Sequence, residues 1–198
     1  MNDWTFRYRL VVGLSIFTVL LVMDVANHGW ESKRPKEYAF LFGAAVFAMA
    51  YGVMHDYLTW SISHDYFVHG KGIPEASERF YPEVMKLGMM ATWSVGLGGA
   101  AAMLVANNPD KFGRTLAYSL LLKLAAWPVA VSVITEAVLG TGAALFATPI
   151  LQSTTGHVAA NRTGFFTVWA MHIGAYAGFV LGLSISVIKT VRAKRRLP

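Results

Sequence analysis

The chain has 198 residues, of which 55% are hydrophobic and 14% are charged, and its mean hydropathy is +0.46. A soluble domain carries about a quarter charged residues, so this chain has too little polar surface for water and is predicted to be a membrane protein. The absence of cysteine excludes disulfides, iron–sulfur clusters and thiolate metal sites. The net charge of +6 does not indicate nucleic-acid binding, because the basic residues lie at the ends of apolar stretches.

Five apolar stretches follow one another, and each is long enough for a transmembrane helix of about 20 residues. We interpret the first as a retained helix rather than a signal peptide, because Asp24, Asn27 and His28 follow it instead of small residues. Pro128 predicts a kink in the fourth stretch. The predicted spans are residues 6–26, 38–62, 84–106, 114–139 and 165–188. The sequence thus predicts an all-α, polytopic transmembrane helix bundle of about five spans, in a single domain over residues 1–198.

Two further patterns bear on the arrangement of these spans. With the N-terminus outside, ten lysines and arginines lie on the inner side and six on the outer side, which favours an N-out, C-in orientation. Gly174, Gly178 and Gly182 recur every four residues in the fifth stretch. Small residues at this spacing predict that the fifth helix packs closely against a neighbour.

Ionisable side chains inside the apolar stretches are the candidates for a functional site, because burying them in a bilayer is costly. His55 and Asp56 lie late in the second stretch, and His172 lies early in the fifth. The second stretch ends outside and the fifth begins outside, so we expect both histidines in the outer half of the bilayer, able to face each other. The residues predicted to form an outward-facing metal cluster are His55, Asp56, His64, Asp65 and His172.

Several chemistries fit this cluster. Imidazole and carboxylate without thiolate suit zinc, copper(II), iron or manganese, and two histidines on two helices also suit the axial positions of a haem. The alternative is that His55–Asp56 and His172 are buried hydrogen-bonding pairs that fix the register of the helices. Lys123 and Glu136 in the fourth stretch are predicted intramembrane charges, which a small proton or ion transporter would use.

Residues 51–67 also carry a recurrent pattern, namely Tyr51-Gly52, His55-Asp56, Thr59, Ile62 and Asp65-Tyr66-Phe67. This pattern resembles a signature of small, uncharacterised bacterial inner-membrane proteins. The chain departs from that signature at Asp65, where glutamate is usual, and at His64, where proline is common. The resemblance covers about seventeen residues and implies a bacterial inner-membrane protein, without implying a particular chemistry.

Three functions remain open at this level. The first is a membrane protein whose cluster binds a transition metal or haem, either alone or as a subunit of a larger membrane complex. The second is an accessory or assembly subunit with no cofactor of its own, and the third is a small proton or ion transporter. The nucleotide, flavin, hydrolase and protease motifs that would assign an enzymatic reaction do not occur. The expected location is the bacterial inner (plasma) membrane, and the expected partners are the lipid bilayer and other membrane subunits.

Overall fold

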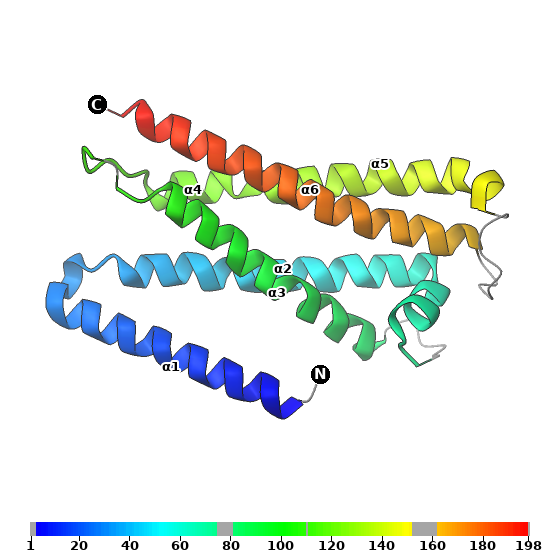
Figure 1. Ribbon diagram of the computed structural model, residues 1–198, viewed down its shortest axis with the longest axis horizontal. Helices are drawn as coiled ribbons and strands as arrows, with labels where there is room; N and C mark the ends of the chain where they lie inside the picture. Colours follow the sequence, from blue (N-terminus) through cyan, green and yellow to red (C-terminus); the bar gives the residue numbers. More distant parts are fainter. Residues whose placement is uncertain (1–2, 75–80, 110, 152–161, 198) are drawn as a thin grey trace. The chain divides into compact units, whose positions relative to one another are not determined.

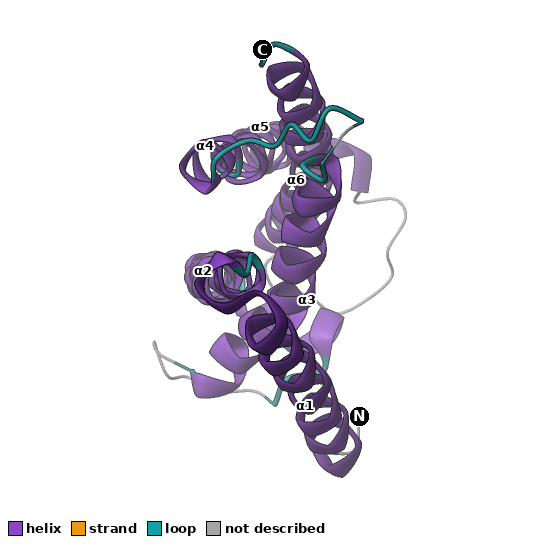
Figure 2. Cartoon of the chain, turned by 90° about the vertical axis from the view of Figure 1, so that its left-hand side faces the viewer, coloured by secondary structure: helices purple, strands orange, loops and turns teal. Residues whose placement is uncertain are grey.

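The computed structural model describes residues 3–74, 81–109, 111–151 and 162–197 of the chain. Within these ranges the chain is helical with connecting loops and contains no strand (Figure 2). The elements are α1 (Asp3–His28), the 3₁₀ turn η1 (Gly29–Glu31), α2 (Arg34–Ile62), the π-helical turn η2 (Tyr66–Gly70), α3 (Pro82–Ala106), α4 (Tyr118–Leu124), α5 (Ala126–Leu151) and α6 (Arg162–Arg195). They divide into two units, Met1–Gly43 and Ala44–Pro198, which are described separately.

Four helical segments of the described chain are long and apolar enough to cross a membrane. They are Arg34–Ile62, Pro82–Ala106, Tyr118–Phe146 and Arg162–Arg195. The first predicted span falls on α1. Its apolar part, Ser15–His28, is shorter than the four segments above. The predicted all-α bundle of membrane-spanning type is therefore confirmed, whereas the N-out, C-in orientation stays a prediction.

The unit Met1–Gly43 is a helical hairpin made by α1, η1 and the beginning of α2. At its turn the Ser32 hydroxyl donates a hydrogen bond of 2.5 Å to the Asp24 carboxylate. Along the hairpin, the Phe17 ring makes edge-to-face contacts with Tyr38 and Phe42, at centroid distances of 5.2 Å and 5.7 Å. These contacts hold the two helices of the hairpin together.

In the unit Ala44–Pro198, α5 and α6 lie side by side (Figure 1) and touch through the glycines of α6. A Cβ atom at Gly174 would lie 2.7 Å from the Cα of Glu136, and one at Gly182 would lie 2.6 Å from the Cα of Pro128. The Ser132 hydroxyl of α5 donates a hydrogen bond of 3.0 Å to the Ala175 carbonyl of α6. The close packing predicted from the glycine spacing is thus confirmed.

Helices α2 and α3 make a second contact of the same kind. Gly52 and Gly88 face each other so closely that a Cβ atom on either would collide with the carbonyl group of the other. Further along α3, a Cβ atom at Gly96 would lie 2.6 Å from the carbonyl oxygen of Ala44. The contact at Gly52 lies about one helical turn before His55, so it fixes the rotation of α2 at the level of the candidate cluster.

The predicted effect of Pro128 appears as a break between α4 and α5 at Ala125. Proline has no N–H, so the carbonyl oxygen of Leu124, four residues earlier, cannot accept the usual helical hydrogen bond. The Ser186 hydroxyl of α6 donates to this oxygen instead, at 2.7 Å. A neighbouring helix therefore satisfies the backbone group that proline leaves unpaired, as a membrane interior requires.

We predict that Gly178→Ala lowers the stability of the α5–α6 pair. The new Cβ atom would lie 2.6 Å from the Cα of Ser132 and 2.7 Å from the carbonyl oxygen of Val131. Overpacking of this kind costs about 1–3 kcal/mol, measured as the free energy of unfolding in detergent. Gly98→Ala is the matched control, because no described atom beyond the adjacent residues and the nearby backbone of its own helix lies within 4 Å of its Cβ position. Equal losses of stability in the two variants would contradict the prediction.

Candidate functional site

Three buried side chains from two helices bring metal-binding atoms together. His55 and Asp56 come from α2 and His172 comes from α6, and one ligand atom from each lies within 4.8 Å of the others. Nε2 of His172 is 3.3 Å from Oδ1 of Asp56, and Nε2 of His55 is 4.0 Å from the same oxygen. The exposed fractions of His55, Asp56 and His172 are 7%, 5% and 8%. The sequence predicted an outward-facing cluster, but the structure buries it among the helices.

A second carboxylate, that of Glu136 on α5, lies beside His55. Its Oε1 is 2.9 Å from Nδ1 of His55, and its Oε2 accepts a hydrogen bond of 2.9 Å from the Tyr51 hydroxyl. The Tyr51 ring, one turn before His55 on α2, stacks on the imidazole at a centroid distance of 5.9 Å. Consecutive helical residues point about 100° apart, so His55 reaches α5 while Asp56 reaches α6.

The hydrogen bonds of the two histidines differ. Nδ1 of His172 is 2.9 Å from the Val168 carbonyl oxygen, which can only accept, so this nitrogen carries a proton and Nε2 faces Asp56. Neither ring nitrogen of His55 has a hydrogen-bond partner among the described residues, although both are buried. Oε1 of Glu136 is close to Nδ1 of His55 but lies off the direction of the ring N–H bond, so the two groups are in contact without a hydrogen bond.

When both imidazoles are neutral, the negative charge of the ionised carboxylates exceeds the positive charge of the described neighbouring groups. Asp56 and Glu136 are both acceptors when ionised, and each has a histidine nitrogen within 3.3 Å. Ionised carboxylates inside an apolar bundle are strongly unfavourable unless a cation or hydrogen-bond donors accompany them. The arrangement therefore favours a positive charge between the two imidazoles, supplied either by protons or by a metal ion.

An aromatic cluster covers the site on the side of η2. The rings of Tyr66 and Phe67 lie 4.7 Å and 6.1 Å from the His172 ring. Burial, with smaller effects of Tyr176 and Asp56, raises the pKa of Tyr66 to about 12, so its phenol stays neutral near pH 7. The members of the buried hydrophobic cluster are Trp60, Tyr66, Phe67, Ile73, Val84 and Val168.

Thr59 and Gly88 are two small residues that contact His55 and Asp56. The Thr59 hydroxyl is fully buried and donates a hydrogen bond of 2.9 Å to the backbone carbonyl of His55. A Cβ atom at Gly88 would lie 3.1 Å from Oδ2 of Asp56, so glycine leaves room for that carboxylate. Several residues of the pattern in 51–67 thus lie at or around the site.

The remaining predicted site residues lie elsewhere. His64 is exposed and its ring lies 4.1 Å from that of Trp60, while Asp65 is half-buried just before η2. Neither belongs to the group formed by His55, Asp56 and His172. Of the predicted intramembrane charges, Glu136 joins the site, and Lys123 is exposed on α4.

Tyr51 and Tyr66 lie at the site but are not among the predicted site residues. Tyr51 and His55 are four residues apart, so their shared helix face was a usable signal. The contact of Tyr66 with His172 depends on the conformation of η2, and the spacing of the residues gives no indication of it.

No family model matches the chain, and neither the curated proteins nor the solved structures include a match to it. The geometry of the buried group is accordingly the feature of the protein that bears on its function.

We predict that Tyr51→Phe destabilises the protein by about 1.5–3 kcal/mol, the usual contribution of a hydrogen bond to a charged group. The variant removes the hydroxyl that donates to Glu136 and leaves the ring that stacks on His55. Thermal unfolding in detergent measures the effect. Tyr8→Phe serves as the control, because Tyr8 is 68% exposed. An unchanged Tyr51→Phe variant would show that the hydroxyl adds no net stability.

Proposed function

We propose that the protein is a multi-pass membrane metalloprotein that binds one divalent transition-metal ion through His55, Asp56 and His172. The observation that carries the proposal is the His55 imidazole, which is buried and has no hydrogen-bond partner at either nitrogen among the described residues. A buried polar group without a partner loses its solvation and gains nothing in return. A metal ion at Nε2 would compensate for that loss.

The distances around Asp56 suit a shared ion. Ligands about 2.1 Å from a metal in tetrahedral geometry lie about 3.4 Å apart. The two separations from Oδ1 of Asp56, 3.3 Å and 4.0 Å, bracket that value. Small rotations of the side chains would bring His55 into range.

The surroundings of the histidines also resemble those of metal ligands. Metal-binding histidines typically direct their other ring nitrogen to a carbonyl or carboxylate, which fixes the orientation of the ring. His172 directs Nδ1 to the Val168 carbonyl, and Nδ1 of His55 lies 2.9 Å from Oε1 of Glu136 without a hydrogen bond between them. In both residues Nε2 is the nitrogen that faces Asp56.

A single ion fits this geometry better than a haem does. The His55 and His172 rings touch edge to face, with centroids 4.5 Å apart. Axial ligands of a haem lie on opposite faces of the porphyrin, so a flat macrocycle would separate them. Direct contact between the two rings leaves no space for it.

Two histidines and one carboxylate select the class of metal. This set suits zinc, iron(II), manganese or copper(II), and as three ligands it leaves at least one coordination position for water or another molecule. Calcium and magnesium prefer all-oxygen sites and fit less well.

A second function follows from the same contacts if no ion binds. Asp56–His172 and Tyr51–Glu136–His55 link α2, α5 and α6, so the cluster would then be a polar clamp in an accessory subunit. The bacterial inner membrane remains the proposed location, on the resemblance carried by residues 51–67.

The test is the metal content of the full-length protein in mild detergent, stripped with a chelator and then reloaded with Zn²⁺ or Co²⁺. We expect about one ion per chain in the wild type. We expect loss of that ion in His55→Ala and in His172→Ala. In the wild type, a metal at 100 times its dissociation constant should also raise the free energy of unfolding by about 2.7 kcal/mol.

The matched controls are His64→Ala and His69→Ala, which remove exposed histidines outside the buried group. Both should keep the ion and the ligand-field absorption of bound Co²⁺. A wild-type protein that folds but retains no metal would refute the proposal and favour the polar clamp. Equal retention by all four variants would place the metal elsewhere.

A further inference from the structure

The two ends of the unit Ala44–Pro198 differ sharply in charge. At one end, the described residues 61–74, 81–86 and 162 contain two acidic and three basic residues, so their charges nearly balance. At the other end, the described residues 107–109, 111–123 and 189–197 contain eight basic residues and no acidic one. The basic residues are Lys111, Arg114, Lys123, Lys189, Arg192, Lys194, Arg195 and Arg196.

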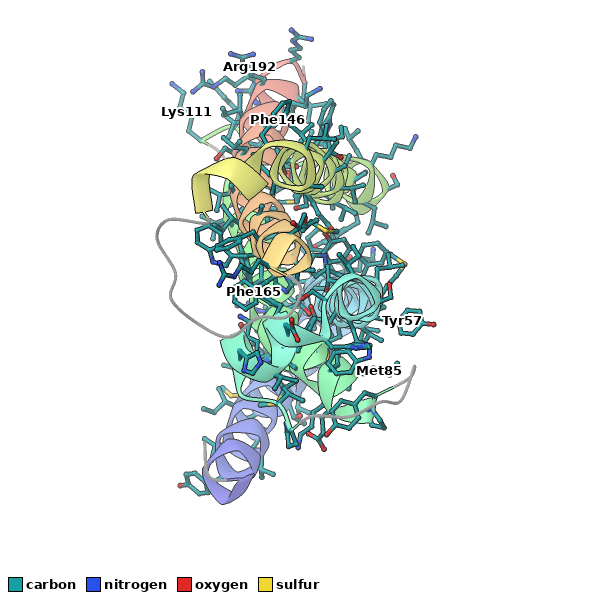
Figure 3. All side chains as sticks on the ribbon, turned by 90° about the vertical axis from the view of Figure 1, so that its right-hand side faces the viewer. Tyr57, Met85, Lys111, Phe146, Phe165 and Arg192 are labelled. Carbon is teal, nitrogen blue, oxygen red and sulfur yellow. The ribbon has the colours of Figure 1, made fainter. Side chains whose placement is uncertain are left out.

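The structure gathers these basic segments at one place. Nζ of Lys194 donates to the carbonyl oxygens of Ala106 and Asn108, at 2.9 Å and 2.8 Å. The Arg114 guanidinium donates to the Leu197 carbonyl at 3.1 Å. The loop after α3 is thereby tied to the end of α6, and Figure 3 shows Lys111 and Arg192 in the same region. The excess charge is therefore concentrated rather than spread along the chain.

Aromatic side chains accompany the cations. Nζ of Lys189 lies 4.2 Å from the centre of the Trp127 ring. Lys111 and Arg114 both lie over the Phe112 ring, at 4.9 Å and 4.7 Å. Aromatic rings next to basic residues are typical of the level at which a membrane protein meets the lipid headgroups.

Exposed apolar side chains stand next to the same cations in the sequences of α4 and α6. Leu122 precedes Lys123 and is 62% exposed, and Ile188 precedes Lys189 and is 49% exposed. The bond from Ser186 to the Leu124 carbonyl holds these parts of α4 and α6 together. A ligand suited to this surface needs a negative group for the lysines and an apolar part for the leucine and isoleucine.

We propose that the junction of α4 and α6 binds the phosphate headgroup of an anionic phospholipid. Lys123, Lys189 and Arg192 supply the positive charge, Trp127 lies at headgroup level, and the acyl chains follow Leu122 and Ile188. The site is independent of the metal proposal, because none of these residues belongs to the buried His55–Asp56–His172 group. It gives the lipid bilayer a specific role as partner at one end of the protein.

The test uses the full chain in vesicles that contain either brominated phosphatidylglycerol or brominated phosphatidylcholine. Bromine quenches the fluorescence of nearby tryptophans, of which the chain has six. The part of the fluorescence that is due to Trp127 is the difference between the wild type and Trp127→Phe. We expect phosphatidylglycerol to quench that part more strongly, with a preference that decreases as salt is added. Each charge removed in Lys189→Gln/Arg192→Gln should lower the preference about fivefold.

The matched control is Lys71→Gln/Lys86→Gln, which removes two exposed lysines at the charge-balanced end and should leave the preference unchanged. Size-exclusion profile and helix content verify that each variant is folded. Equal quenching by the two lipids, or an unchanged preference in Lys189→Gln/Arg192→Gln, would overturn the proposal. Inorganic phosphate should not displace the lipid, and displacement would instead assign the site to a soluble phosphate compound.

Discussion

The cost of placing carboxylates inside an apolar bundle determines the arrangement around His55. Asp56 is 5% exposed, and Glu136 lies in the same buried network. An isolated ionised carboxylate in such surroundings is unfavourable by several kcal/mol, so each needs a cation or donors at contact distance. The imidazoles of His55 and His172 and the hydroxyl of Tyr51 lie at that distance. Three helices therefore cannot rotate independently without separating a buried charge from its partner.

Glycine packing positions the helices that carry these polar contacts. Gly52 and Gly88 bring α2 close to α3, and Gly174 brings α6 close to α5. Gly174 lies against Glu136 itself, and Gly88 lies against the carboxylate of Asp56. The small residues and the ionisable residues thus form one arrangement, in which packing sets the distances that the electrostatics require.

The fold and part of the site could be predicted from sequence because they depend on coarse features. Apolar length located the helices, and the alternation of spans placed His55 and His172 at the same depth. The exclusion of His64 from the group could not be predicted, because it depends on where α2 ends and how the following turn points. The partnership of Glu136 with Tyr51 depends on the rotation of α5 about its axis, which an almost uniformly apolar helix does not reveal.

The break at Ala125 has a mechanical consequence. Helices α5 and α6 pack closely at Gly174, Gly178 and Gly182, whereas the backbone hydrogen bonding is interrupted between α4 and α5. The Ser186 hydroxyl of α6 bonds to the backbone at that interruption. A pull on the loop between α3 and α4 would therefore reach α6 by two routes, through the bond of Ser186 at the break and through the contacts of Arg114 and Lys194 with the end of α6.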